Sequence, residues 1–149
     1  MKFPYYKQER EYSCGAAAMR MVLENLGIKK SENEIIKYLG TNKTKGTMNK
    51  DFPRLAEKFK LNYFVKKNSS ISDLKSLIRN GYNIIICYFY PAEKIGHYSV
   101  IRKIDSNFIY FYDPLFGPKH KYSLHYFNKI WKNNPRYEKV KRWMLGVKR

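Results

Sequence analysis

The chain of 149 residues is 44% hydrophobic and 17% aromatic, which excludes a disordered chain and predicts one domain, residues 1–149, with its own core. Its longest apolar run, residues 84–90, is far too short for a membrane span of about 20 residues, and no apolar segment typical of a secretion signal follows Met1, so we expect a cytoplasmic protein. The net charge of +18, from 30 Lys and Arg against 12 Asp and Glu, would attract nucleic acid, acidic lipid or an acidic peptide, although compositional drift would produce the same charge.

Helical patterns fill the first half of the chain. Ser13 and Ser31 are expected N-caps, and Ser31 with Glu34 forms a capping box. Glycines follow the apolar stretches and stop them, while Pro53 fits a helix only within its first turn. The expected helices cover residues 14–26, 32–39, 48–59 and 72–79, with a short strand at residues 62–66.

The pattern changes to β-branched and aromatic residues in the second half. Two of the expected strands form a hairpin around Asp105-Ser106-Asn107, whose residue types suit a turn. The expected strands cover residues 83–90, 98–104, 108–112 and 142–147, and a last helix begins after Ser123 and runs through residue 131. Helices first and strands later predict an α+β fold with an antiparallel sheet, and argue against a doubly wound parallel sheet.

Cys14 is the candidate nucleophile. It stands at the expected start of the first helix, where unpaired N–H groups and the helix dipole favour a thiolate, and an imidazolium neighbour would favour it further. The alternative is a small core residue beside three alanines. Cys87, in the middle of a strand, is expected to be inert, and in a cytosol both thiols are expected to stay reduced.

His97 and Asp113 are the candidates for a general base and the group that orients it. A thiol nucleophile needs a base, and an adjacent carboxylate fixes the tautomer of that base. A hairpin turn at residues 104–107 would pair positions 97 and 113 to within about one register step, at the same end of adjacent strands. Taken singly, His97 could be a core imidazole and Asp113 a turn residue. His120, in a Lys-flanked loop, and His125, on a helix, are expected to be solvated.

Gln8 completes the set of candidate site residues. Acyl transfer needs two donors aimed at the developing oxyanion. The side-chain amide of Gln8 and the backbone N–H of Cys14 could supply them, although a lone Gln near the N-terminus is otherwise only a polar residue.

In combination these residues resemble the C39-type cysteine peptidases, papain-like proteins whose best-known members remove double-glycine leaders from bacteriocins and other secreted peptides. The resemblance covers residues 6 to 132, nearly the whole chain. It rests on Gln8-x5-Cys14-Gly15-x-Ala17, Gly96-His97-Tyr98-x-Val100-Ile101, Asp113-Pro114 and the segment SLHYFNKIW. It implies a helical N-terminal lobe packed on a C-terminal antiparallel sheet, with Cys14 as nucleophile, His97 as general base, Asp113 as its orienting group and Gln8 as oxyanion donor.

The sequence departs from the leader peptidases at two points. Ser13 stands where they often carry Asp, and no ABC exporter follows the domain before Arg149, so the chain resembles the free-standing branch of the family. The expected substrate is a peptide, acidic or leader-like, cleaved after small residues such as Gly-Gly. A separate exporter and peripheral contact with an anionic membrane are the further partners considered.

Other classes of function are kept as alternatives. The same thiol chemistry could pass the acyl group to an amine, and the sequence does not separate this reaction from hydrolysis. A basic module that binds nucleic acid or another anion is a second alternative, with its densest charge between Lys119 and Arg149, but no nucleic-acid motif is present. A family member without activity is disfavoured because all four site positions are filled. No cofactor is expected, and no metal, since the chain has neither HExxH nor CxxC.

Overall fold

The N-terminal third of the molecule is a lobe of helices. The computed structural model describes residues 2–149. Its first helices are α1 (Cys14–Asn25) and α2 (Glu32–Leu39), followed by a 3-10 turn η1 (Asn49–Asp51) that leads into α3 (Phe52–Lys58). The capping box of Ser31 with Glu34 and the left-handed Gly40 bound α2 as the sequence predicts. The single helix predicted at residues 48–59 is wrong in its first turn, because Pro53 sits in the first turn of α3 and a 3-10 turn precedes it.

A six-stranded antiparallel sheet forms the rest of the described chain, in the order β1-β6-β2-β3-β4-β5. Its elements, together with the two helices inserted between them, are β1 (Asn62–Lys66), α4 (Ile71–Arg79), β2 (Asn83–Tyr90), β3 (Ile95–Ile104), β4 (Phe108–Asp113), β5 (Gly117–Ser123), α5 (Leu124–Ile130) and β6 (Met144–Lys148). This arrangement confirms the predicted α+β fold, with an N-terminal helical lobe on a C-terminal antiparallel sheet.

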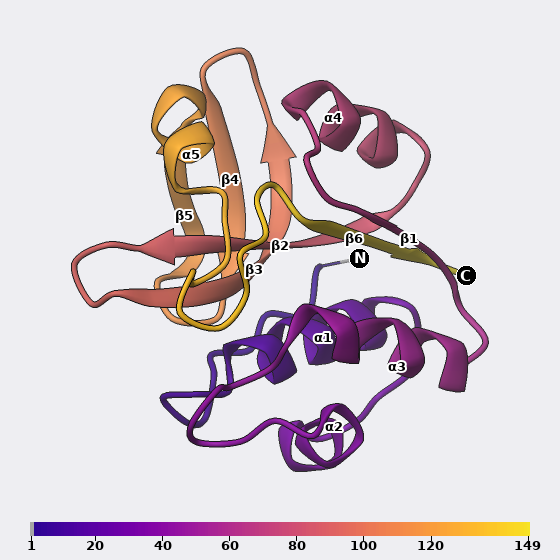
Figure 1. The fold of residues 1–149 in the computed structure, drawn as a ribbon. Coiled ribbons are helices and arrows are strands. Elements are labelled where there is room, and N and C mark those ends of the chain that lie inside the picture. Colours follow the sequence, from indigo (N-terminus) through magenta and orange to yellow (C-terminus); the bar gives the residue numbers. More distant parts are fainter. Residues whose placement is uncertain (1) are drawn as a thin grey trace.

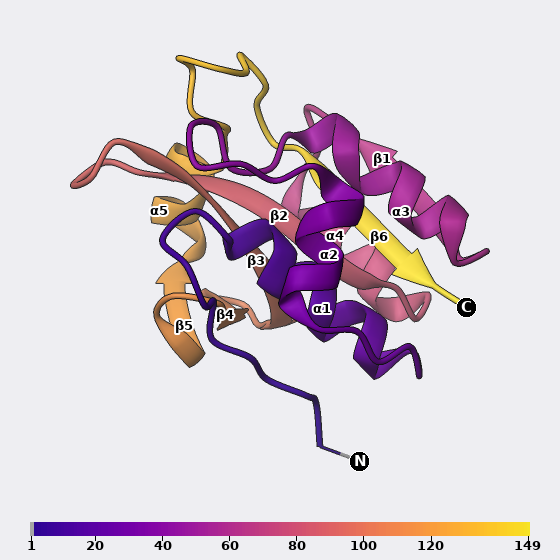
Figure 2. The ribbon, with the colours of Figure 1, turned by 90° about the horizontal axis from the view of Figure 1, so that it is seen from below.

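Helices cover both faces of the sheet, as Figures 1 and 2 show: the lobe of α1, α2 and α3 lies on one face, and α4 and α5 lie on the other. Each face has its own core, because alternate residues of a strand point to opposite sides. Ile85, Cys87 and Tyr98 pack against α1 and its neighbours, whereas Ile86 and Tyr88 pack with the residues of α4 and α5.

Two local features of the strands differ from the predictions. The sequence predicts no strand at β5, because its Gly, Pro and Lys residues have low β propensity. In the structure β5 forms an edge strand paired only with β4, and its lysines suit an exposed edge. The strand β3 begins at Ile95 rather than Tyr98, because Ile95 and Gly96 continue the pairing with β2. His97 is therefore inside the strand.

Candidate active site

Cys14 is the first residue of α1, and its side chain is partly exposed in a cleft between the helical lobe and the sheet. The backbone N–H of Tyr98 donates a hydrogen bond to its Sγ at 3.5 Å. Ser13 precedes the helix as predicted, but its hydroxyl does not cap it: it accepts from the N–H of Arg10 and contacts Glu32 instead. The N-terminus of α1 and the Tyr98 N–H therefore both place partial positive charge beside Sγ.

Gly15 lets a loop approach the start of α1. A Cβ atom at Gly15 would lie 2.8 Å from Oγ1 of Thr47 and 3.1 Å from the ring of Phe52, closer than van der Waals contact allows. Thr47 is held by a 2.6 Å hydrogen bond between its hydroxyl and that of Thr41. The Gly that follows Cys14 therefore permits the close approach of the loop at residues 43–48, which forms one wall of the cleft.

His97 and Asp113 lie together, as the sequence predicts. His97 Nε2 is 2.8 Å from Oδ1 of Asp113, and both side chains are buried. The predicted register is wrong by two residues: β3 and β4 pair Val100 with Tyr112, which places Asp113 opposite Ser99. His97 still reaches the carboxylate because His97 and Ser99, two residues apart in a strand, share a face.

The carboxylate of Asp113 accepts hydrogen bonds from five donors. Its Oδ1 accepts from His97 at 2.8 Å and from the backbone N–H groups of Leu115 and Phe116, both at 2.9 Å. Its Oδ2 accepts from the hydroxyls of Tyr88 and Ser99, both at 2.8 Å. A buried carboxylate is costly unless it is fully hydrogen-bonded, and this one is held in a single orientation, with Oδ1 facing the imidazole.

These contacts shift the pKa values of both groups in opposite directions. Burial alone would lower the pKa of His97, but the neighbouring Cys14 thiolate and the Asp113 carboxylate raise it to about 10. Burial alone would raise the pKa of Asp113, but hydrogen bonds from His97, the Phe116 N–H and Tyr88 hold it well below its ordinary value. At neutral pH the site therefore favours an imidazolium beside the Asp113 carboxylate.

Gln8 lies in the same cleft, close to the end of β4. Its backbone N–H donates to the carbonyl of Pro114, the residue after Asp113, at 2.9 Å. Its side-chain Nε2 donates to the carbonyls of Arg10 and Glu11, at 2.8 and 3.1 Å. Donation to a bound substrate would require the exchange of one of these two bonds.

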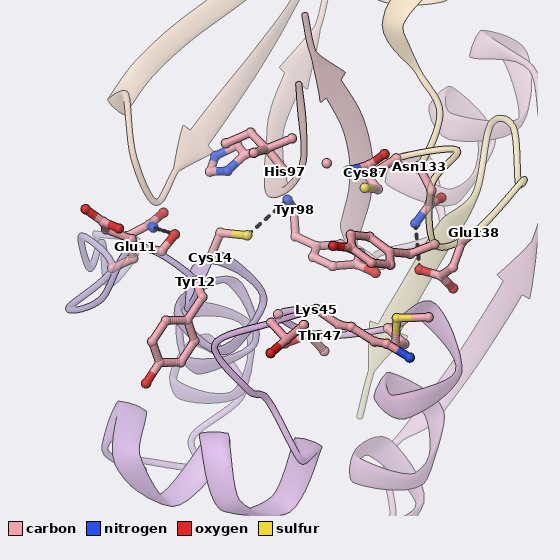
Figure 3. Close-up of a pocket in the computed structure, with 18 of the residues that line it drawn as sticks. Glu11, Tyr12, Cys14, Lys45, Thr47, Cys87, His97, Tyr98, Asn133 and Glu138 are labelled. Atoms are coloured by element: carbon pink, nitrogen blue, oxygen red, sulfur yellow. Dashed lines mark hydrogen bonds between the residues drawn. The ribbon is translucent and has the colours of Figure 1, made fainter. Parts of the chain in front are cut away.

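The cleft has a volume of about 750 Å³ and is lined by both lobes. Figure 3 shows Cys14 at the start of its helix, His97 and Tyr98 on the strand that faces it, and Thr47 on the loop across the cleft. The charged residues that line the cleft include three glutamates, Glu11, Glu93 and Glu138, and two lysines, Lys43 and Lys45. The large positive charge of the chain is therefore not concentrated in this cleft.

The second cysteine differs sharply from the first. Cys87 is only 2% exposed on β2, and burial, followed by the nearby Cys14 thiolate, raises the pKa of its thiol well above the ordinary value. Both cysteines are free.

Sequence reasoning missed the two hydroxyl partners of Asp113. Ser99 could have been found from strand alternation, since it follows His97 by two residues. Tyr88 could not, because its position depends on the β2–β3 register that pairs it with His97. The prediction that His120 is solvated in a loop is wrong as well: it lies half-buried on β5, between the rings of Phe116 and Tyr122.

Residues 2–149 contain neither a metal-binding cluster nor a membrane-spanning helix. They contain no cluster of three or more His, Cys, Asp or Glu side chains placed to hold a metal ion. Among the same residues, no helix has the length and apolar character needed to cross a bilayer.

The sequence of the chain is similar to a known protein family and to one relative of it. The model of the Peptidase_C39 like family matches residues 1–139. A relative from Methanothermobacter thermautotrophicus, described as an uncharacterized protein, is 32% identical over 110 residues, which cover 74% of this chain and 70% of the relative.

Three solved structures share the fold at low sequence identity. The peptidase domain of Streptococcus ComA, a bifunctional ABC transporter involved in a quorum sensing pathway, superposes with a TM-score of 0.77 at 18% identity, covering 98% of each chain. A putative C39-like peptidase from Bacillus anthracis gives 0.75 at 13% identity, covering 99% of this chain and 95% of the other. A double glycine motif protease from an AMS/PCAT transporter, solved with a leader peptide, gives 0.73 at 18% identity, covering 98% and 91%.

Proposed function

The chain belongs to the Peptidase_C39 like family, and on that premise we propose that it is a cysteine peptidase whose nucleophile is Cys14. The observation that carries the proposal is the arrangement of three side chains in one cleft. Cys14 stands at a helix N-terminus with its Sγ 3.5 Å from the backbone N of Tyr98, and His97, the residue before Tyr98, is hydrogen-bonded to Asp113. A thiol, a base and an orienting carboxylate in this order are the components of acyl transfer.

In the proposed reaction, the Cys14 thiolate attacks the carbonyl carbon of the scissile peptide bond. Because Nε2 of His97 is bonded to Asp113, Nδ1 is the ring nitrogen that serves Cys14. His97 gives its proton to the leaving amine as the C–N bond breaks, which leaves a thioester on Sγ. Water then attacks the thioester and gives a proton to His97, and the peptide acid departs from the thiolate.

The developing oxyanion needs donors at the helix start. The backbone N–H of Cys14 belongs to the first turn of α1, whose N–H groups have no acceptor within the helix. The Gln8 amide is the proposed second donor, after release of one of its two carbonyl partners. One such donor contributes about 10²–10³ to kcat in other peptidases.

The proposed substrate is a peptide that lies extended in the cleft. The resemblance to leader peptidases favours small residues such as Gly-Gly before the scissile bond, and one structural neighbour was solved with a leader peptide. A separate exporter is a further proposed partner. The charge of the cleft lining gives no strong preference for an acidic peptide, because glutamates and lysines are nearly balanced there.

A mixture of synthetic peptides with and without Gly-Gly, analysed by mass spectrometry, tests the proposal. We expect cleavage by the wild type and by Cys87→Ala, whose thiol is buried, and none by Cys14→Ala. Equal cleavage by Cys14→Ala would contradict the proposal. Addition of a small amine separates hydrolysis from acyl transfer, because transfer yields an amide in place of the free acid.

A further inference from the structure

Four positively charged residues gather at a second pocket, away from the cleft. A pocket of about 340 Å³ lies between the end of α5, the segment that joins α5 to β6, and the loop between β1 and α4. Its lining contains four cationic residues and no Asp or Glu: Lys129, Lys132, Lys141 and Arg142, together with Asn68, Asn128 and Trp131. It shares no lining residue with the cleft that holds Cys14.

These four cations have no acidic partner within the described chain. The ion pairs that Lys and Arg form in residues 2–149 involve Arg10, Arg20, Lys30, Arg54 and Lys66 instead. Four like charges around one small pocket repel each other, and an anion held between them relieves that repulsion. The C-terminus of α5 favours Lys129 beside it, but two of the cations, Lys141 and Arg142, come from a different segment.

The backbone beneath the pocket is fixed by hydrogen bonds. Arg142 has φ of 52° and Asn68 has φ of 55°, so both adopt the left-handed conformation that residues other than Gly seldom take. Arg142 is held from both sides, since its N–H donates to the carbonyl of Trp131 and its own carbonyl accepts from Ser69. The N–H of Asn68 donates to the carbonyl of Lys141. Unusual backbone conformations of this kind gather at binding sites, where the surrounding structure imposes them.

We propose that this pocket binds a phosphate group, either free or on a lipid headgroup. An Arg fork matches the oxygens of a phosphate, three lysines add point charges, and two Asn amides add neutral donors. A phosphate carries nearly two negative charges at neutral pH, against one for a carboxylate, and so balances more of the four cations. The pocket is large enough for a phosphate group, whereas a strand of nucleic acid needs an extended basic track.

Titration of the ¹⁵N-labelled protein with inorganic phosphate at constant ionic strength tests the site. We expect saturable shifts confined to residues 68–69, 128–132 and 141–142. In Lys141→Gln/Arg142→Gln, affinity should fall tenfold or more, and folding should persist because both side chains are exposed. The matched control is Lys119→Gln/Lys139→Gln, which removes the same charge from exposed positions in the same basic tail. Unsaturable shifts, or equal weakening in the control, would overturn the proposal.

A second arm identifies the source of the phosphate. Vesicles of phosphatidylcholine with and without phosphatidic acid are mixed with the wild type and both variants. Sedimentation with phosphatidic acid that the pocket variant loses assigns a lipid headgroup; saturable phosphate binding without sedimentation assigns a soluble phosphate. Single-stranded DNA that binds more tightly than phosphate, and equally in both variants, would contradict the pocket. The variants should cleave peptides at the wild-type rate, and a wild type without peptidase activity would leave these titrations unaffected.

Discussion

The hydroxyl of Tyr88 is expected to support catalysis although it touches neither Cys14 nor His97 through a hydrogen bond. It donates to Oδ2 of Asp113 at 2.8 Å from a fully buried position. A hydrogen bond to a buried charged group contributes about 1.5–3 kcal/mol, so Tyr88→Phe should lower the melting temperature by roughly 3–12 °C. The carboxylate keeps its other four donors in Tyr88→Phe. We therefore expect kcat to fall about tenfold, which corresponds to a loss of about 1.4 kcal/mol of transition-state stabilisation.

The assay must separate this positioning role from simple loss of stability. Without the Tyr88 hydroxyl, Oδ2 of Asp113 keeps only the Ser99 donor, so the carboxylate is held less firmly in the orientation that faces His97. A weaker hydrogen bond between Asp113 and His97 lowers the pKa of His97 from about 10. In Tyr88→Phe the alkaline limb of the pH profile should therefore move to lower pH while KM stays unchanged. The matched control is Tyr110→Phe, which removes a 2.7 Å hydrogen bond to the exposed Asp105. An unchanged kcat and alkaline limb in Tyr88→Phe, at a temperature where it is folded, would refute the reasoning.

Four further outcomes follow from the same geometry. Iodoacetamide at neutral pH should label Cys14 before Cys87, whose burial raises its pKa; the reverse order in folded protein would contradict the assignment. The free energy contributed by His97 is fully present below its ordinary pKa of 6.5 and is lost as the pH rises toward about 10, so the wild type should lose stability there and His97→Gln should not. Gly15→Ala, whose Cβ would clash with Thr47, should lower the free energy of unfolding by about 1–3 kcal/mol in a denaturant titration. An unchanged free energy of unfolding would contradict this, because it would show that the loop with Thr47 moves to make room. Gln8→Ala should lower kcat by about 10²–10³ with little change in KM, and an unaltered kcat would remove it from the mechanism.

Local sequence signals were enough to predict most of the elements. The capping box at Ser31 and Glu34, the glycine after α2 and the aromatic run of β2 each act within a few residues, and all appear where expected. The helix–strand order was then enough for the α+β class. The proximity of His97 and Asp113 also follows from local reasoning, because a short turn joins their strands.

The remaining features depend on contacts between distant residues. A bulge between Ile101 and Lys103 sets the β3–β4 register, and the residues of the turn do not predict this bulge. Tyr88 reaches Asp113 across 25 positions of sequence, through the register of two strand pairs. The partners of the Gln8 amide are backbone carbonyls, which no side-chain pattern reveals.

Trapping of the acyl-enzyme tests the central claim most directly. A peptide that the wild type cleaves is mixed with the enzyme, quenched in acid within the first turnover, and the protein is mapped by mass spectrometry. The account predicts an added acyl group on Cys14, removable by hydroxylamine, and none in Cys14→Ala. Cleavage that continues in Cys14→Ala, or an acyl group found on another residue while Cys14 stays unmodified, would contradict it.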